Sequence, residues 1–178
     1  MSRYIALLRG INVGGRARIS MAALRELCAD LGHTEVKTYL QSGNVLFHSG
    51  RPPEDLAEEL ETRVAADLGV PARILLRTVD DLERVFAANP FLDRESDPVK
   101  LHVTFLRDVP APERVDALVK PPGETAEFSL EGRELHLHYP DGYGRTKLDN
   151  AFIERRLGVV ATTRNWRTVT ALRGLVSG

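Results

Sequence analysis

The sequence predicts an α+β protein made of two ferredoxin-like α-β plait domains, whose antiparallel sheets carry helices on one face, plus a C-terminal helix. Three observations predict this class. Apolar runs and amphipathic segments follow the order β-α-β-β-α-β up to residue 79, which is the split β-α-β order of a plait. A polar, proline-containing stretch, NPFLDRESDP, occupies residues 89–98. The same order of elements begins again at residue 100.

These boundaries predict an N-terminal plait over residues 1–79, a connecting helix and linker over 80–99, and a C-terminal plait with the terminal helix over 100–178. A chain of 178 residues suffices for one large domain or two small ones. Its hydrophobic share of 43% is that of an ordinary globular protein with a buried core.

The first domain is expected to begin with a buried strand at residues 4–8. Ser20 is a good N-cap for the helix that follows, and Gly32 ends it. The apolar stripe of this helix has i, i+3, i+4, i+7 spacing and consists of Leu24, Leu27, Cys28 and Leu31. Cys28 on such a stripe is expected to fill the core rather than to act as a nucleophile.

A hairpin is predicted next, with strands over residues 35–40 and 45–48 and Ser42-Gly43 as a two-residue turn. A helix over 53–68 follows, because proline and acidic residues stand at its start and Gly69 follows its end. A strand over 72–79 completes this domain.

The second half repeats the pattern with shorter elements. The expected segments are a helix at 80–88, a strand at 100–106, a short helix at 112–119, a hairpin of 125–130 and 133–139 about Glu131-Gly132, a helix at 147–157, a strand at 159–163 and a last helix from about Asn165. The last helix carries Trp166, Val169, Leu172 and Val176 on one side.

Several motifs together resemble the DUF1697 family of bacterial proteins. They are YIALLRGINVGG at residues 4–15, TYLQSGNVLF at 38–47, NPF at 89–91, YGRTKL at 143–148 and TTRNWRTV at 162–169. The resemblance spans nearly the whole chain, and the set is specific although each motif alone is weak. It implies a pair of α-β plaits and implies no established activity, catalytic residue or cofactor.

Composition limits the partners. The formal net charge is −1, so no global field attracts nucleic acid or membranes, and such binding would need a local patch. The single cysteine excludes an internal disulfide and fits a reducing compartment. No signal peptide or membrane span is recognisable. We therefore expect a cytoplasmic protein with no membrane partner and no cofactor; the sequence leaves the oligomeric state open.

The glycine loop RGINVGG, residues 9–15, is the first candidate binding site. Its spacing fits neither a Walker A loop nor a dinucleotide fingerprint. Glycines nevertheless let a ligand approach backbone N–H groups, and a loop between a strand and a helix presents such groups to anions. The candidate ligand residues here are Arg9, Gly10, Asn12, Gly14, Gly15, Arg16 and Arg18.

The QSGN segment, residues 41–44, is expected beside this loop, because a plait ends its first two strands at the same edge of the sheet. Its candidate ligand residues are Gln41, Ser42, Gly43 and Asn44. The alternative interpretation is structural: the glycines serve a tight loop and QSGN is a good turn.

A basic C-terminal region is a secondary candidate. Seven basic residues stand against three acidic ones between residues 141 and 173. If residues 159–163 form the last strand, the YGRTK and TRNW motifs meet and group Tyr143, Arg145, Lys147, Arg164 and Asn165. Basic groups beside an aromatic ring suit phosphates and stacked bases. The structural alternative, which we favour for Trp166, has it buried at the start of the last helix with Asn165 as the N-cap.

Strand alternation places a polar set, His102, Glu127, His136 and His138, on one face of the second sheet. This face suits a metal, a pH response, solvent or a contact between domains. No metal is expected, because the residues recur at strand spacing without a Cys or Asp partner.

Three functions remain open from the sequence. The first is binding, without chemistry, of an anionic ligand, either nucleotide-like or the phosphate of a nucleic acid. The second is an enzyme acting on a small phosphorylated or carboxylated substrate, with the same groups stabilising developing negative charge. The third is a protein-interaction module whose motifs are purely structural.

Overall fold

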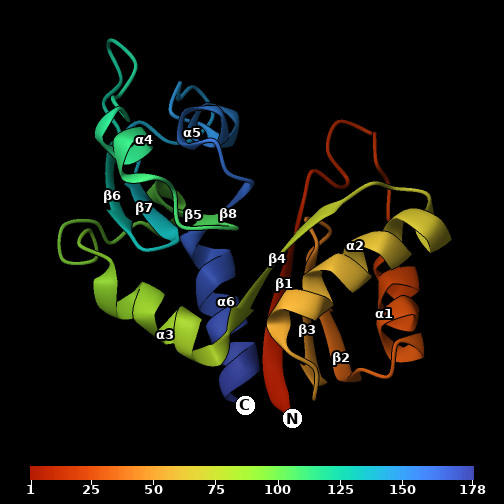
Figure 1. Ribbon diagram of the computed structural model, residues 1–178. Helices are drawn as coiled ribbons and strands as arrows, with labels where there is room; N and C mark the ends of the chain where they lie inside the picture. Colours follow the sequence, from red (N-terminus) through yellow and green to blue (C-terminus); the bar gives the residue numbers. More distant parts are fainter. The chain divides into compact units, whose positions relative to one another are not determined.

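The computed structural model describes residues 1–178 and contains two four-stranded antiparallel sheets and six α-helices (Figure 1). The chain forms two compact units. The first comprises Met1–Leu82 and Leu172–Gly178, and the second comprises Glu83–Ala171. Residues 172–178 therefore group with the first unit, whereas the sequence assigned them to the second domain.

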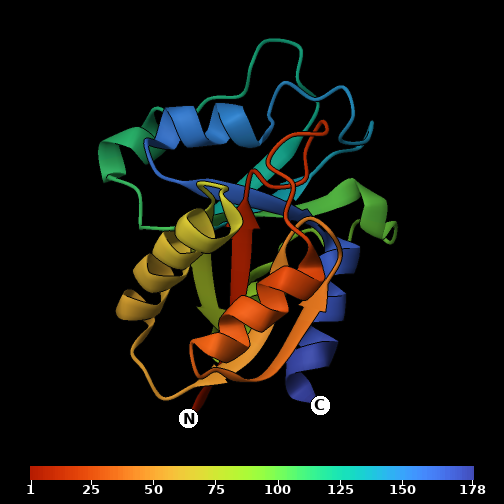
Figure 2. The ribbon, with the colours of Figure 1, turned by 90° about the vertical axis from the view of Figure 1, so that its right-hand side faces the viewer.

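The sheet of the first unit has the order β2-β3-β1-β4. Its strands are β1 (Ser2–Arg9), β2 (Thr34–Tyr39), β3 (Asn44–Ser49) and β4 (Arg73–Thr78). Helices α1 (Met21–Asp30) and α2 (Pro53–Leu68) cover one face of this sheet (Figure 2). The core between these layers includes Tyr4, Ala6, Leu8, Leu24, Leu27, Val45, Phe47, Leu56, Leu60 and Val64.

Local sequence signals set the ends of both helices. The Ser20 hydroxyl accepts a hydrogen bond from the Ala23 N–H and caps α1, as the sequence predicted. Gly69 ends α2 in the left-handed conformation at φ 70°. Leu24, Leu27 and Cys28 are buried on the inner face of α1, and burial raises the pKa of the Cys28 thiol to about 12.

The hairpin of the first unit differs from the prediction. Tyr39 pairs with Asn44, so residues 40–43 form a four-residue loop. The prediction of a two-residue turn at Ser42-Gly43 is therefore wrong. Leu40 and Gly43 both have positive φ in this loop. The longer loop has a packing reason, because a Cβ built at Gly43 would lie 2.6 Å from the Ile11 Cδ1 and 2.8 Å from the Leu8 Cβ.

The sheet of the second unit has the order β6-β7-β5-β8. Its strands are β5 (Leu101–Leu106), β6 (Glu127–Glu131), β7 (Glu134–His138) and β8 (Ala161–Asn165). The short helix α4 (Pro112–Asp116) and α5 (Asn150–Leu157) contribute to a core with Leu106, Leu118, Ala126, Leu135, Leu137, Leu148, Ile153, Leu157 and Ala161. Helix α5 begins later than predicted because Asp149 caps it through the Phe152 N–H.

The remaining elements are α3 (Val79–Ala88), the 3₁₀ turn η1 (Pro98–Lys100) and α6 (Trp166–Ser177). The Asn165 side chain accepts a hydrogen bond from the Thr168 N–H at the start of α6, as the N-cap prediction requires. Trp166 is buried and its ring lies 4.5 Å from that of Phe86, which agrees with the core assignment. No helix combines the length and apolar character that a membrane crossing needs.

The second hairpin also turns one position later than predicted. Glu131 pairs with Glu134, so the turn residues are Gly132 and Arg133 rather than Glu131 and Gly132. The shift pairs Glu127 with His138 and Ser129 with His136.

The predicted polar face is only partly correct. Directly opposed residues of neighbouring strands share a face. Glu127 and His138 pair and lie on one face, with His136 two residues from His138 on the same side. His102 pairs with Leu137 and therefore lies on the opposite face, where its ring stacks 4.7 Å from that of Tyr143.

Candidate functional site

The tip of the glycine loop is a small hairpin of its own. Val13 and Arg16 form a β-bridge, and the Arg16 N–H donates to the Val13 carbonyl at 3.0 Å. Gly14 and Gly15 between them have φ values of 58° and 73°. Positive φ at both central positions is what a type I′ turn requires, and glycine adopts it without steric cost. The paired glycines therefore have a backbone role that is independent of any ligand.

Asn12 joins the glycine loop to its surroundings. Its side-chain amide donates to the carbonyls of Ile19 at 3.1 Å and of Gln41 at 2.6 Å, and its side-chain oxygen accepts from the Ile19 N–H at 2.8 Å. These bonds fix the loop against both the entry to α1 and the hairpin loop. The glycine loop and the QSGN segment thus lie side by side.

The QSGN segment divides into an inner and an outer half. The side chain of Asn44 is buried, and its amide donates to the Tyr39 carbonyl at 2.7 Å and to the Ser42 hydroxyl at 3.1 Å. The Gly43 carbonyl accepts from the Leu8 N–H at 2.9 Å. Asn44 and Gly43 therefore close the hairpin loop, whereas Gln41 is exposed.

A pocket of about 470 Å³ opens between the two loops and the start of α1. Its lining residues are Asn12, Gly15, Arg18, Ile19, Ser20 and Gln41. A Cβ built at Gly15 would lie 3.7 Å from a terminal nitrogen of the Arg18 guanidinium, so the cation stands directly beside this glycine. The lining includes one cation and no carboxylate.

The start of α1 adds to the electrostatics of the pocket. Ser20 is both a lining residue and the N-cap. The leading N–H groups of a helix have no partner within the helix and carry partial positive charge, which favours anions. The sequence analysis did not predict Ile19 and Ser20 as pocket residues. The N-cap character of Ser20 could have indicated its position at the pocket.

Four candidates from the glycine loop lie outside the pocket lining: Arg9, Gly10, Gly14 and Arg16. Arg9 ends β1 opposite Arg73. Arg16 is exposed at the base of the loop tip. The structure therefore brings Asn12, Gly15, Arg18 and Gln41 together.

The secondary basic patch is not assembled as one group. Arg164 pairs with Val103 and is buried, and its guanidinium donates to the Thr162 hydroxyl at 2.6 Å and to the Thr163 carbonyl at 3.1 Å. The adjacent β5 residue His102, which stacks on Tyr143, lies on the other face of the sheet. Arg145 and Lys147 are exposed in the loop before α5, while Asn165 caps α6.

The carboxylate of Glu124 holds the YGRTKL loop in place through hydrogen bonds. One of its carboxylate oxygens accepts from the Thr146 hydroxyl at 2.8 Å and from the Lys147 N–H at 2.7 Å. Partial burial raises the pKa of this carboxyl, but hydrogen bonds from Ala126, Lys147, Thr146 and Leu148 outweigh it and lower the pKa below its ordinary value. A carboxylate thus holds the backbone of this motif, while the side chains of Arg145 and Lys147 stay exposed.

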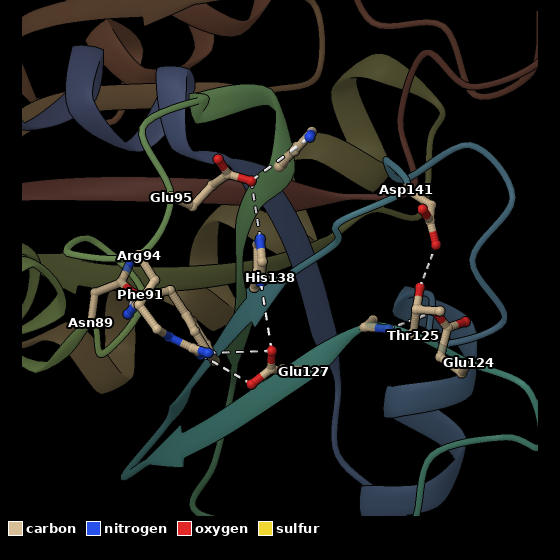
Figure 3. Close-up of polar contacts among 11 residues, drawn as sticks. Asn89, Phe91, Arg94, Glu95, Glu124, Thr125, Glu127, His138 and Asp141 are labelled. Carbon is tan, nitrogen blue, oxygen red and sulfur yellow. Dashed lines mark hydrogen bonds and ion pairs between the residues drawn. The ribbon is translucent and has the colours of Figure 1, made fainter.

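The linker after α3 forms an acid–histidine cluster with the β6–β7 hairpin (Figure 3). The His138 Nε2 lies 3.1 Å from Glu95, and its Nδ1 lies 3.9 Å from Glu127. Arg94 binds Glu127 at 3.0 Å. The hydrogen bond from His138 lowers the pKa of Glu95, and that from Arg94 lowers the pKa of Glu127.

The NPF motif belongs to this cluster. The Phe91 ring lies 5.8 Å from the His138 ring, and the Asn89 side chain accepts from the Phe91 N–H at 3.0 Å. Sequence reasoning placed Glu127 and His138 on one face but missed Arg94 and Glu95, because the linker's path over the hairpin is a tertiary feature. The cluster contains no nucleophile, and no group of three or more His, Cys, Asp or Glu side chains is placed to hold a metal. Its polar contacts include the ion pairs of Arg94 with Glu127 and of His138 with Glu95.

Comparisons with known proteins agree with this picture of the fold. A family model described as "Protein of unknown function (DUF1697)" matches residues 1–136. A solved structure, that of the conserved bacterial protein SP0830 from Streptococcus pneumoniae, is similar with a TM-score of 0.75 and 25% sequence identity over 98% of each chain. A comparison with curated proteins gave no match.

Proposed function

Because the chain belongs to the DUF1697 family, whose function is unknown, we propose a function from the pocket itself: the first unit binds an anionic, nucleotide-like small molecule without chemistry. The observation that carries this proposal is the pocket of about 470 Å³, in which Arg18 and the start of α1 converge with no carboxylate in the lining. This volume lies in the range of small-molecule sites.

In the proposed complex, Arg18 contacts a phosphate or carboxylate of the ligand through two parallel hydrogen bonds. Gly15 adopts a φ of 73°, which favours glycine, and the absence of a side chain there lets this group approach the backbone closely. Gln41 orients the rest of the ligand with its exposed amide. This proposal assigns no contact with the ligand to four of the predicted residues: Arg9, Arg16, Ser42 and Asn44.

Binding is favoured over catalysis by the residue types of the lining. A general acid or base needs a titratable side chain such as His, Glu, Asp, Lys, Cys or Tyr within reach of the reacting group. The lining has none of these, and the hydroxyl of Ser20 is engaged as a helix cap.

For the architecture, we propose that each unit is a ferredoxin-like plait. The orders β2-β3-β1-β4 and β6-β7-β5-β8 both match the split β-α-β arrangement. We keep the division near residues 80–99 as a proposed domain boundary, and the cytoplasmic location stays a prediction.

Thermal unfolding of the full chain with inorganic pyrophosphate and with adenosine nucleotides tests the function. A ligand at 100 times its Kd stabilises the folded state by about 2.7 kcal/mol, so Tm rises measurably. We expect this rise in the wild type and in Arg63→Ala, which removes a half-buried arginine paired with Asp67 in α2. We expect Arg18→Ala to abolish it.

The proposal fails if no anion raises Tm, or if Arg18→Ala responds as the wild type does. Tight binding of single-stranded RNA with steep salt dependence would instead assign the site to nucleic acid.

A further inference from the structure

His136 is a buried polar residue without a partner. It lies in β7 with 0% of its surface exposed, and neither ring nitrogen makes a hydrogen bond. Burial lowers its pKa to about 4, so the ring is neutral at pH 7 and offers one N–H donor and one nitrogen acceptor. Buried polar atoms in native proteins nearly always have partners, so both nitrogens call for an explanation.

A cavity of about 410 Å³ reaches this residue within the second unit. One wall is formed by residues of α3, and the other by residues of the β6–β7 hairpin. The lining residues are Arg84, Val85, Ala87, Ala88, Glu131, Gly132, Glu134 and His136. The small side chains of Ala87 and Ala88 leave the space open on the helix side.

We propose that this cavity is a second ligand site, which binds an uncharged small molecule carrying an amide or a nitrogen heterocycle. The polar end of the ligand hydrogen-bonds the neutral imidazole of His136, and its flat apolar part lies against Val85, Ala87 and Ala88. This site is separate from the anion pocket of the first unit in its residues and in its ligand class.

The charge that the polar end of the ligand can carry follows from His136. Arg84 and Glu131 are exposed and Glu134 is half-buried, so solvent screens these charges of opposite sign. A charged group placed against the buried, neutral imidazole would lose its hydration without gaining an opposite charge, which is costly. The polar end of the ligand is therefore expected to be a neutral group that donates or accepts a hydrogen bond.

Three probes of equal size and shape test the ligand class: benzamide, benzoate and benzamidine. In the full chain, we expect benzamide to shift the ring ¹⁵N signals of His136 saturably. We expect benzoate and benzamidine to bind at least about tenfold more weakly.

Two variants locate the site. Ala87→Leu fills the cavity from an exposed position of α3, and Ala151→Leu is the matched control on an exposed position of α5. We expect benzamide binding to fall about tenfold or more in Ala87→Leu and to stay unchanged in Ala151→Leu. His136→Phe, which keeps a buried ring but removes both nitrogens, is expected to fold and to lose benzamide binding.

The inference is overturned if none of the probes binds, if benzoate or benzamidine binds as tightly as benzamide, or if Ala87→Leu binds benzamide like the wild type. None of these outcomes bears on pyrophosphate binding in the first unit, because the two sites share no residue.

Discussion

At the scale of single residues, Asn12 connects the walls of the pocket between the glycine loop and the QSGN segment. Its side chain makes three hydrogen bonds, two to Ile19 and one to Gln41, and its backbone has a φ of 53°. Asparagine tolerates this left-handed conformation better than most residues. One residue thus sets both the backbone path of the glycine loop and its distance from the hairpin loop.

We predict that Asn12→Ala lowers the free energy of unfolding by about 1–3 kcal/mol, because two carbonyls and one N–H lose their partner and alanine is strained at this φ. Urea unfolding measures the loss, and hydrogen exchange of the Ile19 amide reports the local effect. Asn12→Gly separates the two causes, since glycine has no strain here. If Asn12→Gly is as stable as the wild type, the side-chain bonds contribute nothing and the argument is wrong.

At the scale of elements, the QSGN loop depends on close contact with the strand beside it. Gly43 has a φ of 87° and lies against Leu8 and Ile11, where a Cβ would come within 3 Å of both side chains. The four-residue loop is therefore a packing solution between β1 and the hairpin, not a free turn.

We predict that Gly43→Ala destabilises the protein by about 2–4 kcal/mol, from strain at positive φ together with overpacking. Gly50→Ala is the matched control, because open space surrounds Gly50 and its φ is not positive. Its free energy of unfolding is expected within about 0.5 kcal/mol of the wild type. Equal stability of the two variants would contradict the close-approach argument.

Sequence patterns predicted the kind of each element well, because helical periodicity, caps and apolar runs are local. The N-caps Ser20 and Asn165 and the end of α2 at Gly69 are examples. Both hairpin turns were placed wrongly, since loop length is fixed by contacts such as that of Gly43 with Leu8. His102 was assigned to the wrong face of the second sheet for another reason: β5 is buried on both faces, so alternation of polar and apolar residues could not place it.

For the candidate site, the sequence placed the two loops on one rim, because plait topology determines which strand ends meet. Of the eleven ligand residues predicted at that rim, four line the pocket: Asn12, Gly15, Arg18 and Gln41. Asn44 turns inward to Tyr39, and Arg164 is buried on the far side of its sheet from Tyr143. Such orientations follow from tertiary packing, which spacing alone does not encode.

At the scale of the whole molecule, three buried histidines predict how stability depends on pH. Burial lowers the pKa of His33 as well as those of His102 and His136. For His102 and His136, burial brings the pKa to about 4. The unfolded chain, with histidine pKa near 6.5, binds more protons in the interval between these values. The free energy of unfolding should therefore be highest above pH 6.5 and fall as the pH drops toward 4.

His102 and His136 are each expected to contribute on the order of 1–3 kcal/mol to this fall. His136→Phe removes one contribution, so the stability difference between wild type and variant should change by that amount between pH 7.5 and pH 4.5. Urea unfolding at several pH values measures this difference in the free energy of unfolding. The titration of carboxylates affects both proteins alike and cancels in the difference. A difference that stays constant across this range would show that His136 titrates normally.

We propose that the pocket between the glycine loop and the QSGN segment binds an anion. An NMR titration of the full chain with inorganic pyrophosphate tests it most directly, by following the Gly15 and Ser20 amides and the Arg18 guanidinium. We predict saturable shifts concentrated at these three groups and absent in Arg18→Ala. Shifts confined to Arg145 and Lys147, or no saturable shift at all, would contradict the claim.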